Sequence, residues 1–253
     1  MPFTEVILVP SAMIISLFSS TVNQQADYDN LANRALQRGI DLYMNKDYQG
    51  AAKEFKRSIA LSPYSVYSDK AYEYLAYAYL NQNMEGEAVN TYKEMLKRNP
   101  MNDSAHLSLG NLYIKDGKYQ EAEMEYRLAV RINPASAMNR YALGMSYMAT
   151  DKFIEAEAQF RRVVQITPRD VHAYDALGQA LRKLGRYDEA IIQFESALAI
   201  DKKSTDIYLS LGYTYADMKE IDKAQEQVDI LQELDPQQVP ELQEYVRQRS
   251  DPR

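Results

Sequence analysis

The chain has 253 residues, of which 46% are hydrophobic and 26% are charged, and its formal net charge is −7. This composition is typical of an ordered protein and excludes collagen-like and intrinsically disordered chains. The chain contains no cysteine, which excludes disulfides, thiolate catalysis and cysteine-ligated metals. The acidic balance lacks the positive charge expected of a protein that binds nucleic acid.

The first 26 residues contain an apolar run, VILVPSAMIISLF, which begins at Val6 and ends at Phe18. Its length suits the apolar part of a signal peptide and is short for a membrane span. No Lys or Arg precedes Arg34, so the basic start of a signal peptide is missing. We interpret residues 1–26 as an apolar arm of a cytoplasmic protein that docks on protein. The alternative is export, or membrane association through this run.

Residues 27–236 repeat one pattern. A proline slot recurs along the chain, with Lys202 in place of one proline: Pro63, Pro100, Pro134, Pro168, Lys202 and Pro236. From Pro100 onward the interval is 34 residues, and the first step is three residues longer. The period predicts six repeats, at about residues 32–68, 69–102, 103–136, 137–170, 171–204 and 205–238.

Each repeat is predicted to be two helices joined by a tight turn. A Leu followed by a small residue occupies the first half, as in Leu109-Gly110 and Leu143-Gly144, and an Ala with an aromatic residue four positions later occupies the second. These spacings place the residues on one face of a helix, and turns such as KDGKY and KLGRY separate the halves. The small residues allow close backbone approach beside the aromatic ring. One pair of helices leaves apolar faces uncovered, so the pairs must stack.

This pattern resembles the tetratricopeptide repeat, whose signature is W-x2-L-G-x2-Y, then A-x3-F, then P, at a period of 34 residues. The sequence has HLSLGNLY in the third repeat and YDALGQAL in the fifth. It departs from the signature in having no Trp, in Lys202, and in Val228 at the last aromatic slot. The resemblance implies an all-α, right-handed α-solenoid that binds peptides in a concave groove. It does not identify the partner, because function lies in surfaces and not in the fold.

Residues 239–253 are predicted to form a capping helix and tail. Pro240 and Glu241 favour a helix start, and Arg247 and Arg249 suit its end. A frayed tail is the alternative interpretation.

The first helix of each repeat carries a second stripe, two residues out of phase with the packing stripe. In this family that stripe faces the groove. It begins with Leu36 and is apolar through four repeats, whereas the fifth repeat has His172, Asp175, Gln179 and Arg182. We define the groove row as the stripe's candidate partner-binding residues: Ile40, Tyr43, Tyr77, Leu80, Asn111, Ile114, Tyr141, Met145 and Met148.

Three explanations of this apolar row stay open. Neighbouring repeats bury it, or it binds an apolar or amphipathic peptide, or it is covered by the arm or by a second copy of the chain. The Lys and Arg clamp of chaperone-binding relatives is missing, since its slots hold residues such as Leu36, Tyr74 and Ser108.

Catalysis is not expected. The Glu121 and Glu125 pair lies on a charged outward face, and the two histidines, His106 and His172, are far apart in the sequence. We interpret His106 as structural and His172 as solvated. The sequence predicts a non-catalytic interaction scaffold or assembly factor without a cofactor or metal.

Overall fold

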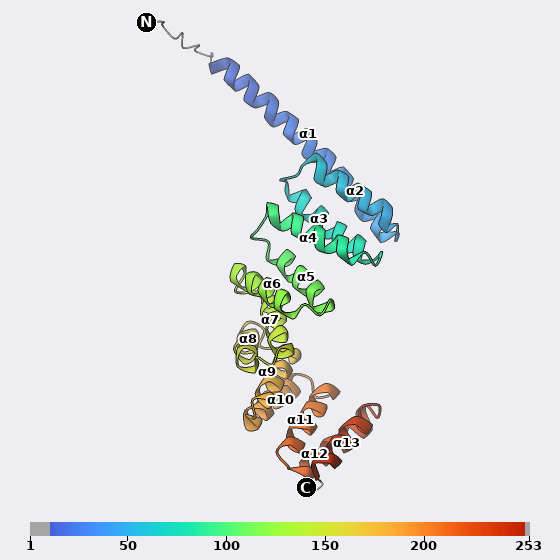
Figure 1. Ribbon diagram of the computed structural model, residues 1–253, viewed down its shortest axis with the longest axis vertical. Coiled ribbons are helices and arrows are strands. Elements are labelled where there is room, and N and C mark those ends of the chain that lie inside the picture. Colours follow the sequence, from blue (N-terminus) through green and yellow to red (C-terminus); the bar gives the residue numbers. More distant parts are fainter. Residues whose placement is uncertain (1–10, 251–253) are drawn as a thin grey trace, which may run out of the picture. The chain divides into compact units, whose positions relative to one another are not determined.

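The computed structural model describes residues 11–250, with side chains described for residues 24–250. This part of the chain forms thirteen α-helices and no strand (Figure 1). The helices are α1 Ser11–Met44, α2 Tyr48–Leu61, α3 Val66–Leu80, α4 Glu85–Arg98, α5 Asp103–Lys115, α6 Tyr119–Ile132, α7 Ala137–Ala149, α8 Phe153–Ile166, α9 Val171–Lys183, α10 Tyr187–Ile200, α11 Thr205–Asp217, α12 Ile221–Leu234 and α13 Val239–Ser250. The prediction of an all-α solenoid of helix-turn-helix repeats is confirmed.

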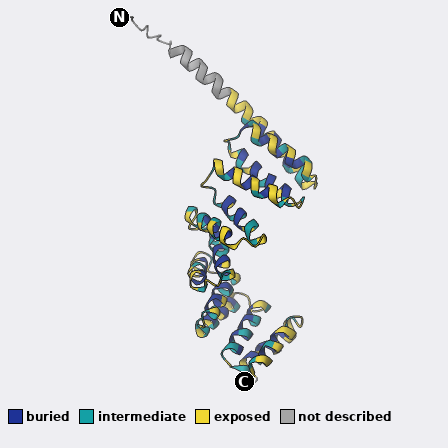
Figure 2. Cartoon of the chain, in the orientation of Figure 1, coloured by how far each residue is buried: buried dark blue, intermediate teal, exposed yellow. Residues whose placement is uncertain are grey.

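The chain divides into two compact units, residues 1–105 and residues 106–253, which we call unit 1 and unit 2. In unit 1, α1 packs on α2 and α3, and α3 packs on α4. In unit 2, α7 to α12 pack in chain order, α7 also contacts α9, and α9 also contacts α11. The first helices of neighbouring repeats are therefore in contact in three cases, α1 with α3, α7 with α9, and α9 with α11. Along the helices, buried and exposed residues alternate with the helical period (Figure 2).

Helix α1 begins well before the first predicted repeat. No Gly or Pro interrupts the sequence between Ser11 and Arg38, so nothing ends the helix at residue 26, where we placed the end of the arm. The residues of the apolar run before Ser11 lie outside the described residues. Within residues 11–250, no helix combines the length and the apolar character needed to cross a membrane.

The second helix of each repeat ends two residues before its proline slot, as at Ile132 before Pro134 and Ile166 before Pro168. The predicted pairing of small and aromatic residues forms the centre of the repeats. A Cβ atom added to Gly144 would lie 2.5 Å from Cε1 of Phe160, and one added to Gly110 would lie 2.5 Å from Cε1 of Tyr126. Glycine is required at these two positions because the ring occupies the space of a side chain.

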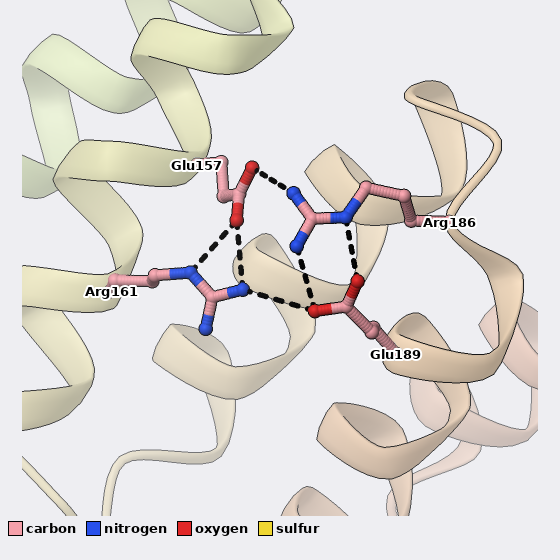
Figure 3. Close-up of polar contacts among 4 residues, drawn as sticks. All are labelled: Glu157, Arg161, Arg186 and Glu189. Atoms are coloured by element: carbon pink, nitrogen blue, oxygen red, sulfur yellow. Dashed lines mark hydrogen bonds and ion pairs between the residues drawn. The ribbon is translucent and has the colours of Figure 1, made fainter.

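Charged side chains join the second helices of neighbouring repeats. Between α8 and the start of α10, Glu157 accepts hydrogen bonds from Arg161 at 2.8 Å and from Arg186 at 2.6 Å (Figure 3). Glu189 closes the network through Arg186 at 2.7 Å and Arg161 at 3.3 Å. One period earlier, Glu123 pairs with Lys152 at 2.6 Å. The same acidic position thus links successive repeats of unit 2.

The capping helix is formed as predicted. Helix α13 packs on α11 and α12, and its buried residues are Val239, Leu242 and Val246. These side chains share a core cluster with Val228 and Leu231 of α12. The last repeat is therefore closed by α13. The predicted tail, residues 251–253, lies outside the described residues.

Candidate peptide-binding surface

The groove row of unit 1 lies on α1 and α3 and is built around tyrosine rings. Tyr74 stands edge-on to Tyr43, with ring centroids 6.0 Å apart, and edge-on to Tyr77 at 6.4 Å. Asn81 donates to the Tyr43 hydroxyl at 2.9 Å, which holds the last turn of α3 against α1. Ile40, Tyr43 and Leu80 are half-buried, whereas Tyr77 is 42% exposed. Tyr74 is not a member of the predicted groove row. Its spacing from Tyr77 could have identified it, because residues three apart on a helix lie side by side.

An acidic side chain borders this aromatic surface. Burial raises the pKa of the Glu73 carboxyl, and the charge of Asp69 raises it further. Burial also raises the pKa of Tyr77, with a second contribution from the charge of Glu73. The unit 1 surface therefore combines apolar rings and hydroxyl groups with one partly desolvated acid.

The groove row of unit 2 lies on α5 and α7. Ile114, Tyr141 and Met148 are partly buried against the core of the unit. The Tyr141 ring packs on Phe160 with centroids 5.6 Å apart, and burial raises the pKa of its phenol. Met145 is 47% exposed on the same helix face. The half-buried members form a floor, and Met145 stands out from it.

Asn111 is held in a defined orientation. The Tyr126 hydroxyl donates to Asn111 Oδ1 at 2.7 Å, and burial raises the pKa of Tyr126 to about 12, so the phenol stays protonated as a donor. Asn111 itself is exposed. Because its oxygen is engaged by Tyr126, its amide nitrogen is the group oriented to donate to an incoming carbonyl.

The stripe is not uniformly open, because one of its members is fully buried. Leu36, the first residue of the stripe, is 1% exposed and belongs to the core. Helix α1 packs on both α2 and α3, which encloses this side chain. In the second, third and fourth repeats one position stays exposed, and it is occupied by Tyr77, Asn111 and Met145. The half-buried members of the row thus form a floor in each unit, and the exposed residues form a central line above it, with Tyr77 in unit 1 and Asn111 and Met145 in unit 2.

The polar residues of the fifth repeat lie on α9. His172 is exposed, and its backbone N–H donates to Asp170 Oδ1 at 3.0 Å. His106 is buried, and its Nδ1 lies 2.6 Å from Glu125 Oε2, in agreement with a structural role. Among residues 11–250, no three His, Cys, Asp or Glu side chains gather in a way that suits a metal ion.

Three family profiles, each described as tetratricopeptide repeat, match residues 75–137, 133–203 and 181–248. No curated protein matches the chain.

Solved structures are similar over most of the chain. A tetratricopeptide repeat protein from Parabacteroides merdae ATCC 43184 has 18% identity and a TM-score of 0.68, covering 81% of this chain and 80% of that one. YrrB, described as a TPR protein with an unusual peptide-binding site, has 23% identity and a TM-score of 0.65, covering 76% and 99%. The pilF protein of Pseudomonas aeruginosa has 16% identity and a TM-score of 0.67, covering 86% and 98%. At these identities the likeness shows the fold.

Proposed function

The chain belongs to the tetratricopeptide repeat family, and on that premise we propose that it is a non-catalytic scaffold or assembly factor that binds peptide or helix segments of partner proteins. The proposed binding surface is the groove row, treated separately in unit 1 and in unit 2. The proposed ligand is a segment with apolar side chains that contact Tyr77 in unit 1 or Met145 in unit 2.

One observation carries this proposal. The central position of the row is exposed in three successive repeats while the residues beside it are packed into a floor. Packing within each unit explains the floor, but it does not use the exposed faces of Tyr77 and Met145. A tyrosine offers a rigid anchor with little entropy to lose, and a methionine adapts its shape to different apolar partners. Asn111 adds a donor for a peptide carbonyl.

The comparisons support the proposal only at the level of the fold. YrrB is described as having a peptide-binding site, and its similarity of 0.65 in TM-score covers 76% of this chain. The similarity does not transfer the ligand, because it concerns packing positions and not the exposed line.

The test uses the full chain as the target for a random-peptide library displayed on phage. Tyr77→Glu and Met145→Glu place a charge on the exposed line of unit 1 and of unit 2. Tyr119→Glu and Met124→Glu are the matched controls, because these residues are 40% and 63% exposed and lie on α6, outside the row. Circular dichroism establishes that all four variants stay helical.

We expect the wild-type chain and both control variants to enrich the same apolar-rich peptides. We expect Tyr77→Glu or Met145→Glu to lose them, because apolar contact on a charged side chain requires its desolvation. Enrichment that neither row variant changes would contradict the proposed surface. The absence of any enriched peptide would contradict peptide binding itself.

A further inference from the structure

The groove row of unit 2 continues onto α9 with a carboxylate. Asp175 lies 34 residues after Tyr141, so it takes the same place on α9 that Tyr141 takes on α7. Helices α7 and α9 are in contact, and the charges of Asp175 and Asp170 add to the burial that raises the pKa of Tyr141. An anionic group therefore stands beside the aromatic floor of the row.

Two neutral side chains hydrogen-bond this carboxylate, and the charge of His172, three residues before it on α9, partly offsets the effect of its burial. Ser210 Oγ donates to Asp175 Oδ1 at 3.0 Å, and Gln179 Nε2 donates to Oδ2 at 2.7 Å. Within residues 11–250, no Lys or Arg forms an ion pair with Asp175. Burial raises its pKa, and the charge of Asp206 acts in the same direction. A partly desolvated carboxylate beside a second one is in an unfavourable environment that an added cation would relieve.

The cation at the end of the same helix is already used. Arg182 Nη1 pairs with Asp217 at 2.8 Å, and the guanidinium lies over the Tyr213 ring at 5.4 Å from its centroid. Asp217 also accepts from the Tyr245 hydroxyl of the capping helix at 2.6 Å. Arg182 is therefore held toward α11 and α13 and does not neutralise Asp175.

We infer that the groove row of unit 2 selects a peptide segment in which a Lys or Arg accompanies the apolar side chains, and that Asp175 and the Tyr141 ring receive its cation. This inference rests on the proposed function and names the chemistry of its ligand. The row supplies an apolar floor, an outward amide donor at Asn111 and, at Asp175, a carboxylate that pairs with no Lys or Arg of residues 24–250, so a cationic segment would complement its charge. A cation between a carboxylate and an aromatic face gains from both.

The geometry also predicts the spacing in the ligand. Met145 and Asp175 lie on neighbouring first helices that contact each other, and packed helices are about 8–10 Å apart. An extended peptide advances about 3.3 Å per residue. The cationic residue should therefore follow or precede the residue that contacts Met145 by about three positions.

The experiment applies the phage-displayed random-peptide library to the full wild-type chain and to Asp175→Asn, with Asp188→Asn as the matched control. Asp188 is exposed on α10, away from the row. Asparagine keeps the size of Asp175 and can still accept from Ser210. Asp175→Glu, which keeps the charge, is the rescue variant. One enriched peptide is then synthesised with its Lys or Arg replaced by norleucine, and binding is measured by fluorescence anisotropy.

We expect enrichment of Lys or Arg on the wild-type chain and on Asp188→Asn, and its loss on Asp175→Asn. Replacing the cation should weaken binding to the wild-type chain about tenfold and should not change binding to Asp175→Asn. Asp175→Glu should retain part of the preference.

Two results would overturn the inference. The first would leave the proposed function standing, and the second would contradict it as well. Peptides that require Met145 but bind Asp175→Asn as tightly as wild type would contradict the recognition of a cationic residue by Asp175. They would still support the groove row as the binding surface. No peptide at all, together with a dimer of the full chain in sedimentation that Met145→Glu dissolves, would assign the row to a second copy and refute both.

Discussion

Leu242 of the capping helix lies directly over Gly212 of α11, where an added Cβ atom would come within 2.6 Å of Leu242 Cδ2. In the earlier repeats of unit 2 this space is filled from within the repeat, by Tyr126 over Gly110 and by Phe160 over Gly144. The sixth repeat has Val228 at the aromatic slot, and the smaller side chain leaves room for Leu242. The last aromatic residue is thus replaced by a contact that requires the capping helix.

Val228→Phe should therefore displace α13. The ring would compete with Leu242 for the space over Gly212, and overpacking of this kind costs about 1–3 kcal/mol. We expect a lower thermal midpoint and faster amide exchange confined to α13. In the double variant Val228→Phe with Leu242→Ala, part of the loss should be recovered, because the two side chains share one space. Additive effects of the two substitutions would contradict this account.

Gly144→Ala should destabilise unit 2 by about 1–3 kcal/mol, because its Cβ would lie 2.5 Å from Phe160 Cε1. Gly86→Ala is the control. Gly86 lies on α4, and a Cβ atom added there has no neighbouring atom within 4 Å. That control should not lower stability, because Gly86 lies in the first turn of α4 and alanine suits a helix at least as well as glycine. Thermal unfolding followed by circular dichroism measures both, and equal effects would show that the ring moves aside.

Glu157→Gln should weaken the link between α8 and α10 shown in Figure 3. The substitution removes the charge that accepts from Arg161 and Arg186, at a cost of about 1–2 kcal/mol. Glu155→Gln on the same helix is the control, because Glu155 is exposed. We expect the two variants to differ less in thermal midpoint in 1 M salt. At that ionic strength the Debye screening length is about 3 Å, so charge–charge interactions are weakened. A midpoint equal to the control's would show that the network is not stabilising.

Asp175→Asn should fold at least as stably as the wild-type chain at neutral pH. Burial raises the pKa of the Asp175 carboxyl above its ordinary value of 3.8, so ionisation opposes folding. The stability that this group contributes is fully present below its pKa in the unfolded chain and is lost as the pH rises through its pKa in the folded chain. The thermal midpoint of the variant relative to wild type should therefore rise as the pH increases from 3.8. A difference in thermal midpoint between variant and wild type that is smaller at pH 7 than at pH 4 would contradict this account.

The location of the protein is tested by cell fractionation of the full chain and of a chain that begins at residue 27. We propose a cytoplasmic location and expect both forms in the soluble fraction. The competing interpretation, anchoring through the run from Val6 to Phe18, requires the full chain in the membrane fraction and its release when residues 1–26 are removed.

Much of the site was predictable as a set of positions. The period identified Tyr77, Asn111 and Met145 as members of one row, since a helix repeats its faces regularly. It could not separate them from Leu36, which lies in the same stripe but is buried by α2 and α3. The orientation of Asn111 also depends on Tyr126, a residue of the next helix.

Helix pairs stacked at a 34-residue period could be predicted from the amino-acid sequence alone, because packing positions and turns recur in each repeat and a proline ends all but one of them. Three features come from the packing of one repeat on another: which members of the groove row stay exposed, the contact of Leu242 over Gly212, and the ion pair of Arg182 with Asp217, which leaves Asp175 without a Lys or Arg partner among residues 24–250. These features depend on which side chain of a neighbouring repeat or helix fills a given space. The sequence period gives the spacing along the chain and does not give distances between side chains of different helices.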